Sequence, residues 1–174
     1  MVAHRRLSTS PGVRGGCPQL RCRRVRPPPA LGWILQSVFV DFLDESRHAL
    51  GSCRCAPDSP SAWRAVWALL QASLVTGRCD GAGTVDWARY TVEIDHARVA
   101  LLQAVPAPEP ASSMFPEPTV DSPRVRQAVR DLAGELARVY LVASVDQRRR
   151  PSSRRWLREA ATHLSRAAKH LASS

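Results

Sequence analysis

Residues 123–143 read PRVRQAVRDLAGELARVYLVA, and this stretch decides the fold class. Its apolar residues alternate at spacings of four and three, which places them along one side of an α-helix. The residues of this seam are Val125, Val129, Leu132, Leu136, Val139 and Ala143. Ser122 or Asp121 can cap the first turn, and Pro123 suits the first helical position. The stretch therefore predicts a long helix with one buried side.

A second helix is predicted to follow at about residues 153–172, after a break at 148–151. Its apolar face comprises Leu157, Ala160, Leu164, Ala167 and Leu171. The two helices make a hairpin whose apolar seam is too narrow for a core of its own. The hairpin must therefore dock on the upstream residues or on a second chain.

Upstream, the first predicted helix spans about residues 31–50, although segment 33–42 is β-branched and aromatic enough to fit a short strand. Its expected apolar face is Leu35, Val38, Phe39, Phe42 and Ala49.

The next helix is expected to begin at Pro60, capped by Asp58 or Ser59, and to stop at Gly77. Its expected apolar face is Trp63, Val66, Trp67, Leu70 and Leu74. We interpret Trp33, Trp63, Trp67 and Trp87 as core residues.

The third upstream helix is expected at 85–105, with Thr84 as its cap and Pro106 after its end. One heptad stripe holds Trp87, Tyr90, Ile94, Ala97, Leu101 and Ala104. A second stripe, Val85, Val92 and Val99, lies almost opposite. Two apolar faces imply two packing partners, so this helix is either central in the fold or shared with another subunit.

These elements predict an all-α protein, a compact bundle of four or five helices with a disordered basic N-terminal tail. The expected organisation is a tail at 1–29, a three-helix segment at 30–105, a proline-rich linker at 106–122 and the hairpin at 123–174. We expect the hairpin to dock on segment 30–105 and so to complete one domain.

The net charge of +10 resides mainly in the tail. Residues 1–29 hold seven arginines and no acidic residue, which leaves 18 basic against 15 acidic residues in the rest of the chain. Arginine, proline and glycine without large apolar groups favour disorder, and a mis-assigned start codon is the alternative interpretation. The scarcity of lysine, asparagine and isoleucine indicates a GC-rich genome, which also enriches arginine.

Five cysteines, an odd number, favour a reducing compartment, and we expect a cytoplasmic protein. The most apolar run, 30–43, is interrupted by Gln36 and Asp41 and is shorter than the roughly 18 residues of a membrane span. No membrane association is predicted.

An arginine cluster is the strongest candidate site. It comprises Arg148, Arg149, Arg150, Arg154, Arg155 and Arg158, with Trp156 as a stacking surface. Positive charge at the start of a helix is unfavourable, so Arg154 and Arg155 break a local rule. The cluster fits a nucleic acid or another polyanion, although solvated arginines at a surface turn are common.

Metal-binding patterns are weaker. His48, Cys53, Cys55 and Cys79 could converge, but the Cys-x-Cys spacing is too tight for a typical zinc site. A di-iron centre needs two Glu-x-x-His pairs, and only Glu93 and His96 have that spacing. Glu159 and His163 are four apart and Glu135 stands alone, so these five residues are interpreted as surface groups. The glycine-rich segment 81–84 has no lysine and follows a helix, so it is not a nucleotide loop. No metal, cofactor or catalytic set is predicted.

The sequence therefore predicts a non-enzymatic helical interaction or regulatory protein of unknown partner. A homodimer would use helix 85–105 or helix 123–146. The alternative is a nucleic-acid-associated accessory protein that uses the arginine cluster. A metal-dependent enzyme is the third hypothesis.

Overall fold

The structure, a computed structural model, describes residues 29–52, 56–74, 86–106, 116 and 121–172. These residues form five helices and no strand. The helices are α1 (Pro29–Ser52), α2 (Pro60–Ser73), α3 (Trp87–Ala104), α4 (Pro123–Ser144) and α5 (Pro151–His170). The predicted all-α bundle is confirmed, and segment 33–42 is helical. The predicted tail, the glycine-rich segment 81–84 and most of the predicted linker lie outside the described residues.

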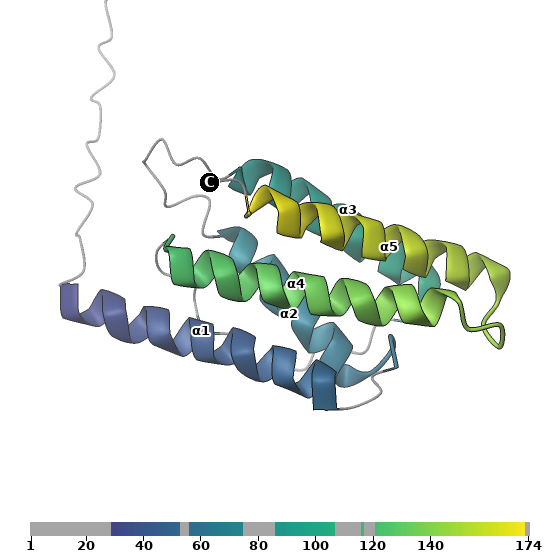
Figure 1. The fold of residues 1–174 in the computed structure, drawn as a ribbon, viewed down its shortest axis with the longest axis horizontal. Helices are drawn as coiled ribbons and strands as arrows, with labels where there is room; N and C mark the ends of the chain where they lie inside the picture. The colour runs from purple at the N-terminus through teal and green to yellow at the C-terminus, as the bar shows by residue number, and fades with distance from the viewer. Residues whose placement is uncertain (1–28, 53–55, 75–85, 107–115, 117–120, 173–174) are drawn as a thin grey trace, which may run out of the picture.

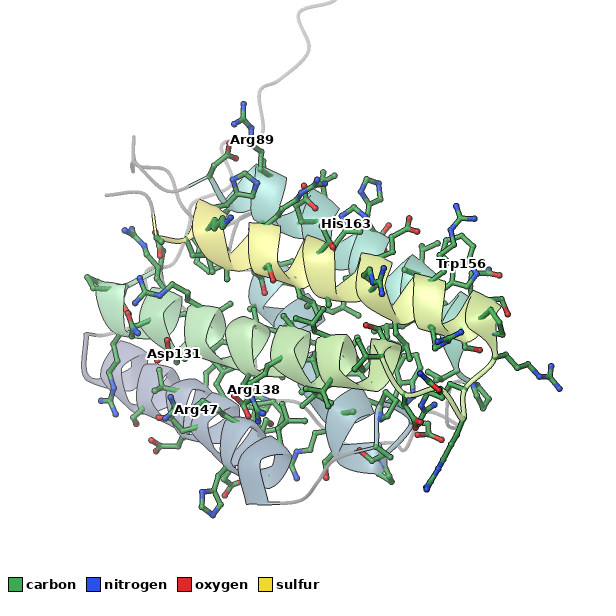
Figure 2. The ribbon with its side chains drawn as sticks, turned by 45° about the vertical axis from the view of Figure 1, so that its right-hand side comes forward. Arg47, Arg89, Asp131, Arg138, Trp156 and His163 are labelled. Atoms are coloured by element: carbon green, nitrogen blue, oxygen red, sulfur yellow. The ribbon has the colours of Figure 1, made fainter. Side chains whose placement is uncertain are left out.

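Helix α4 occupies the middle of the bundle (Figure 1). It packs against α1 on one side and α5 on the other, while α2 crosses behind it. Helix α3 packs mainly on α5 and also contacts α2. Arg47 of α1 bonds the carboxylate of Asp131 of α4 at 3.4 Å, which ties the first helix to the fourth at the surface (Figure 2).

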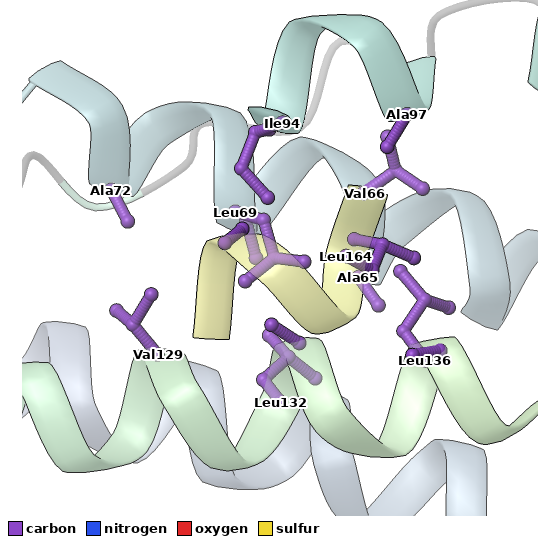
Figure 3. Close-up of a cluster of buried hydrophobic side chains, with 14 of the residues drawn as sticks. Ala65, Val66, Leu69, Ala72, Ile94, Ala97, Val129, Leu132, Leu136 and Leu164 are labelled. Carbon is purple, nitrogen blue, oxygen red and sulfur yellow. The ribbon is translucent and has the colours of Figure 1, made fainter. Parts of the chain in front are cut away.

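One continuous apolar core joins all five helices. Leu132 and Leu136 of α4 meet Leu69 of α2, Ile94 of α3 and Leu164 of α5 at its centre, and all five side chains are buried (Figure 3). Burial of apolar surface is the main favourable term in folding, so this junction holds the bundle together.

Side-chain caps begin three of the helices. Ser59 Oγ accepts the backbone N–H of Ala62 at 3.2 Å, and Ser122 Oγ accepts that of Val125 at 3.2 Å. Each serine precedes a proline at the first helical position, as the sequence predicts. Asp86 caps α3 by accepting the backbone N–H of Arg89 at 2.9 Å. The third helix therefore begins at Trp87 rather than directly after Thr84.

The predicted apolar faces of the last three helices are confirmed. Each of the six seam residues of α4 and the five of α5 is buried, and on α3 only Ala104 of the predicted stripe is half-buried. Helix α5 starts at Pro151, two residues earlier than expected.

The expected faces of α1 and α2 are partly wrong. On α1, whose side chains are described from Ser37 onward, the buried apolar residues are Phe39, Val40, Leu43 and Leu50, whereas Val38 is 47% exposed. The side chain of the predicted Leu35 lies outside the described part. On α2 the chain buries an alanine-rich side, Ala62, Ala65, Ala68 and Ala72, together with Trp63, Val66 and Leu69. Trp67 is exposed and is not a core residue. Small side chains let α2 approach its neighbours closely, which leaves the bulky Trp67 and Leu74 outside.

None of the described helices combines the length and the apolar composition needed to cross a membrane.

Candidate functional site

The arginine-rich turn connects α4 to α5. Asp146 accepts the backbone N–H of Arg148 at 3.0 Å, which shapes the turn. Arg149 reaches Asp58, beside the start of α2, at 3.5 Å and so anchors the turn to the bundle. Arg154 is half-buried, and its Nε is enclosed without a hydrogen-bond partner among the described residues. Arg149 and Arg154, two of the six predicted arginines, are therefore only partly exposed to solvent.

The other four arginines of the predicted cluster, Arg148, Arg150, Arg155 and Arg158, are exposed. None of their guanidinium groups has a carboxylate within 4.0 Å in the part of the chain that the structure describes. The guanidinium of Arg155 lies 5.4 Å from the centre of the half-buried Trp156 ring near the start of α5 (Figure 2). Helix α5 also has no acidic residue in its first turn. The turn thus presents positive charge beside one aromatic ring.

Helix α3 carries a second exposed feature, which we call the outer stripe: Ala88, Val92, Val99 and Leu102. Val92, Val99 and Leu102 are 53%, 46% and 43% exposed. Their spacing continues the a and d positions of one heptad pattern. Asp95 occupies the d position between the valines and pairs with Arg98 at 2.9 Å. The predicted Val85 lies outside the described residues.

Three potential metal ligands meet where α3 packs on α5. Glu93 and His96 are three residues apart, so they share one face of α3. His163 of α5 joins them, with its Nδ1 2.6 Å from Glu93 Oε2 (Figure 2 labels His163). The rings of His96 and His163 have centroids 5.1 Å apart and an interplanar angle of 63°. One ligand atom from each residue lies within 4.8 Å of the other two.

The antiparallel packing of α3 and α5 explains this meeting. The first turns of α3 lie beside the last turns of α5, where Arg89 and Glu93 border a surface depression together with His170. Glu93 and His163 each precede a buried core residue, Ile94 and Leu164, so both stand at the edge of the core. Their side chains are only 18% and 16% exposed, whereas His96 is exposed.

From the sequence these three residues are interpreted as surface groups, because a four-helix di-iron centre would also need Glu135 and Glu159 at matching positions. Glu135 lies on α4 and bonds Arg138, and neither glutamate belongs to the group on α3 and α5. Of the weak zinc candidates, His48 is exposed on α1, and Cys53, Cys55 and Cys79 lie outside the described residues.

A surface depression over α1, α2 and α4 is lined mainly by charged residues. Most of its charged side chains pair with one another or with close neighbours. Arg64 bonds Glu45 at 3.3 Å, and Arg47 lies 3.6 Å from Asp44. The Arg138 guanidinium beside Glu135 lowers the pKa of that carboxyl below its usual value. These are the contacts of a solvated surface.

No protein-family model, curated protein or solved structure matches the chain.

Proposed function

We propose that this protein is a non-enzymatic interaction protein that acts as a homodimer, paired through the outer stripe of α3. The observation that carries the proposal is the exposure of three large apolar side chains at heptad spacing, on a helix whose opposite face is already in the core. The other candidate for pairing, the seam of α4, is buried within the single chain. The outer stripe is therefore the better surface for a second copy.

The pattern of the stripe favours a copy of the same helix as its occupant. Helices with apolar a and d positions pair with helices of the same pattern, and two-fold pairing uses one patch twice. A parallel pair would place two Asp95 carboxylates face to face, and like charges repel. An antiparallel pair can instead bring Asp95 of each copy near Arg98 of the other copy, so we propose the antiparallel arrangement.

A second exposed apolar patch, Leu141, Val142 and Val145, lies at the end of α4. It occupies little more than one helical turn, whereas the outer stripe runs over most of α3. A pairing surface gains from length because each successive turn adds buried apolar area. The α4 patch therefore serves as the matched control.

Val92→Glu combined with Val99→Glu is expected to weaken dimerisation at least 100-fold. Each buried valine contributes up to about 1.5 kcal/mol, and about 1.4 kcal/mol changes an equilibrium constant tenfold. Sedimentation equilibrium measures the dissociation constant, and circular dichroism checks that the helices persist. Leu141→Glu combined with Val142→Glu adds the same charge and is expected to leave the dimer intact. A strictly monomeric wild-type protein, or equal weakening in both variants, would disprove the proposal.

A second candidate function is polyanion binding at the arginine-rich turn. It is favoured by the four exposed arginines that lack a described carboxylate and by Trp156 beside Arg155. A protein that binds nucleic-acid phosphates releases counterions from the nucleic acid. Its affinity for the nucleic acid therefore falls steeply as the salt concentration rises. A partly exposed aromatic ring can also stack on a base of single-stranded nucleic acid.

Arg155→Glu combined with Arg158→Glu is expected to lower the affinity for a fluorescent single-stranded oligonucleotide at least tenfold and to flatten its salt dependence. Fluorescence anisotropy over a range of salt concentrations measures both quantities. The tail arginines are present in every variant, so the difference reports on the turn. Arg64→Glu combined with Arg124→Glu reverses two exposed charges elsewhere and is the control. An equal loss in the control, or affinity that does not depend on salt, would refute this function.

A further inference from the structure

We propose that Glu93, His96 and His163 form a binding site for one divalent transition-metal ion of the zinc class. The site lies where α3 packs on α5, and none of its three residues belongs to the outer stripe. It requires only the three side chains that the packing of α3 on α5 already brings together.

The distances between the ligand atoms fit such a site after small side-chain movements. Zinc binds histidine nitrogen and carboxylate oxygen at roughly 2.0–2.2 Å, so neighbouring ligand atoms in a tetrahedral site stand roughly 3.3 Å apart. Glu93 Oε2 and His163 Nδ1, at 2.6 Å, are closer than this, and the three ligand atoms all fall within 4.8 Å of one another. Rotation of the side chains can bring the three ligand atoms around one ion.

The donor set selects the class of ion. Two imidazoles and one carboxylate are the protein ligands of many zinc sites that keep a fourth position open. Calcium and magnesium prefer oxygen ligands alone, so they are poor occupants. His96 is exposed and gives the ion a route from solvent. Glu93 and His163 are mostly buried, where the attraction between a carboxylate and a cation is stronger than in water.

An ordinary hydrogen bond between Glu93 and His163 accounts for only part of this arrangement. It does not explain why the ring of His96, which is on the exposed edge of α3, lies against the ring of His163. It also leaves the Glu93 carboxylate with a histidine as its one partner among the described residues. Arg89, one turn before Glu93, pairs with Asp86 instead. A carboxylate without an arginine partner, beside two imidazoles, is a favourable place for a metal cation.

The test uses the full chain, purified with chelator and reductant and then titrated with zinc chloride by calorimetry. We expect one zinc ion per chain with micromolar or tighter affinity. Cobalt chloride is expected to give the visible absorption of a low-symmetry, four- or five-coordinate site. His96→Ala is expected to lower zinc affinity at least about 100-fold. Loss of a residue that only hydrogen-bonds a metal ligand lowers metal affinity by about 10- to 100-fold, so the larger loss indicates a direct ligand. Because His96 is exposed, this variant keeps its fold.

Two controls separate this site from its competitors. His170→Ala removes a histidine from the same helix as His163 and is expected to bind zinc normally. Cys53→Ser combined with Cys55→Ser and Cys79→Ser removes the thiols that could bind zinc elsewhere, and it is also expected to bind normally. Glu93→Gln is expected to lose affinity like His96→Ala, with thermal unfolding in chelator as the check on its fold.

Three results would overturn the proposal: no binding at submillimolar zinc, unchanged zinc affinity in His96→Ala, or loss of zinc in the cysteine variant. None of these substitutions changes a residue of the outer stripe, and zinc binding and dimerisation are measured separately. Failure of the zinc site would therefore leave the dimer proposal standing, and failure of the dimer would leave the zinc site standing.

Discussion

Leu132→Ala is expected to destabilise the protein by about 2–5 kcal/mol, the range for a buried leucine whose removal leaves a cavity. Leu132 is completely buried on the central helix α4. Its side chain points into the cluster where residues of α2, α3 and α5 converge (Figure 3). Neighbours from several helices cannot all move inward to fill the space, so the cost should lie in the upper part of this range.

Urea unfolding followed by circular dichroism measures this loss. Leu141→Ala is the matched control, because it makes the same chemical change on the same helix at a position that is 53% exposed. It is expected to cost less than about 1 kcal/mol. Equal destabilisation by the two substitutions would show that Leu132 does not occupy the centre of the core.

Local chemistry accounts for the parts of the fold that the sequence predicts well. Ser59 with Pro60, and Ser122 with Pro123, specify helix starts because the serine hydroxyl and the proline ring act within one turn of the chain. The seam of α4 is equally clear because its other side is largely polar. Only one orientation of that helix buries apolar surface without burying charge.

Where a helix has two apolar sides, periodicity alone cannot tell which side enters the core. On α2 the large residues suggested a face that includes Trp67, but the alanine side packs inward. The choice depends on the shapes of α1, α3 and α4, which meet α2 only in the folded chain. The same reason explains the error at Val38 of α1 and the half-buried position of Phe42.

The candidate metal site depends even more on tertiary structure. The spacing of Glu93 and His96 is visible in the sequence, but His163 lies 70 residues after Glu93. Only the register of α3 against α5 makes them neighbours, and no pattern within either helix fixes that register. The arginine-rich turn is local and was found from the sequence, yet the pairing of Arg149 with Asp58 was not, because it joins residues 91 positions apart.

Tyr90→Phe is expected to change both the stability and its dependence on pH. Tyr90 is completely buried, and its hydroxyl donates a hydrogen bond to the backbone carbonyl of Leu69 at 2.9 Å. Phenylalanine keeps the edge-to-face contact with Trp87 but removes the hydrogen bond to that carbonyl. The loss at neutral pH is expected to be about 1–2 kcal/mol.

Burial raises the pKa of the Tyr90 hydroxyl well above its ordinary value of 10.0. The folded state therefore favours the neutral phenol, whereas the unfolded chain ionises near pH 10. The resulting stabilisation is complete below pH 10 and is lost as the pH rises above it. Wild-type protein should thus lose stability above pH 10, and Tyr90→Phe should lose less.

Urea unfolding at pH 7 and at pH 10.5 measures this difference. All other side chains are the same in the two proteins, so the difference between the proteins isolates Tyr90. The gap in unfolding free energy between wild type and variant should be smaller at pH 10.5 than at pH 7. A gap that stays constant with pH would mean that the Tyr90 hydroxyl is open to water, because only a buried phenol resists ionisation while the chain remains folded.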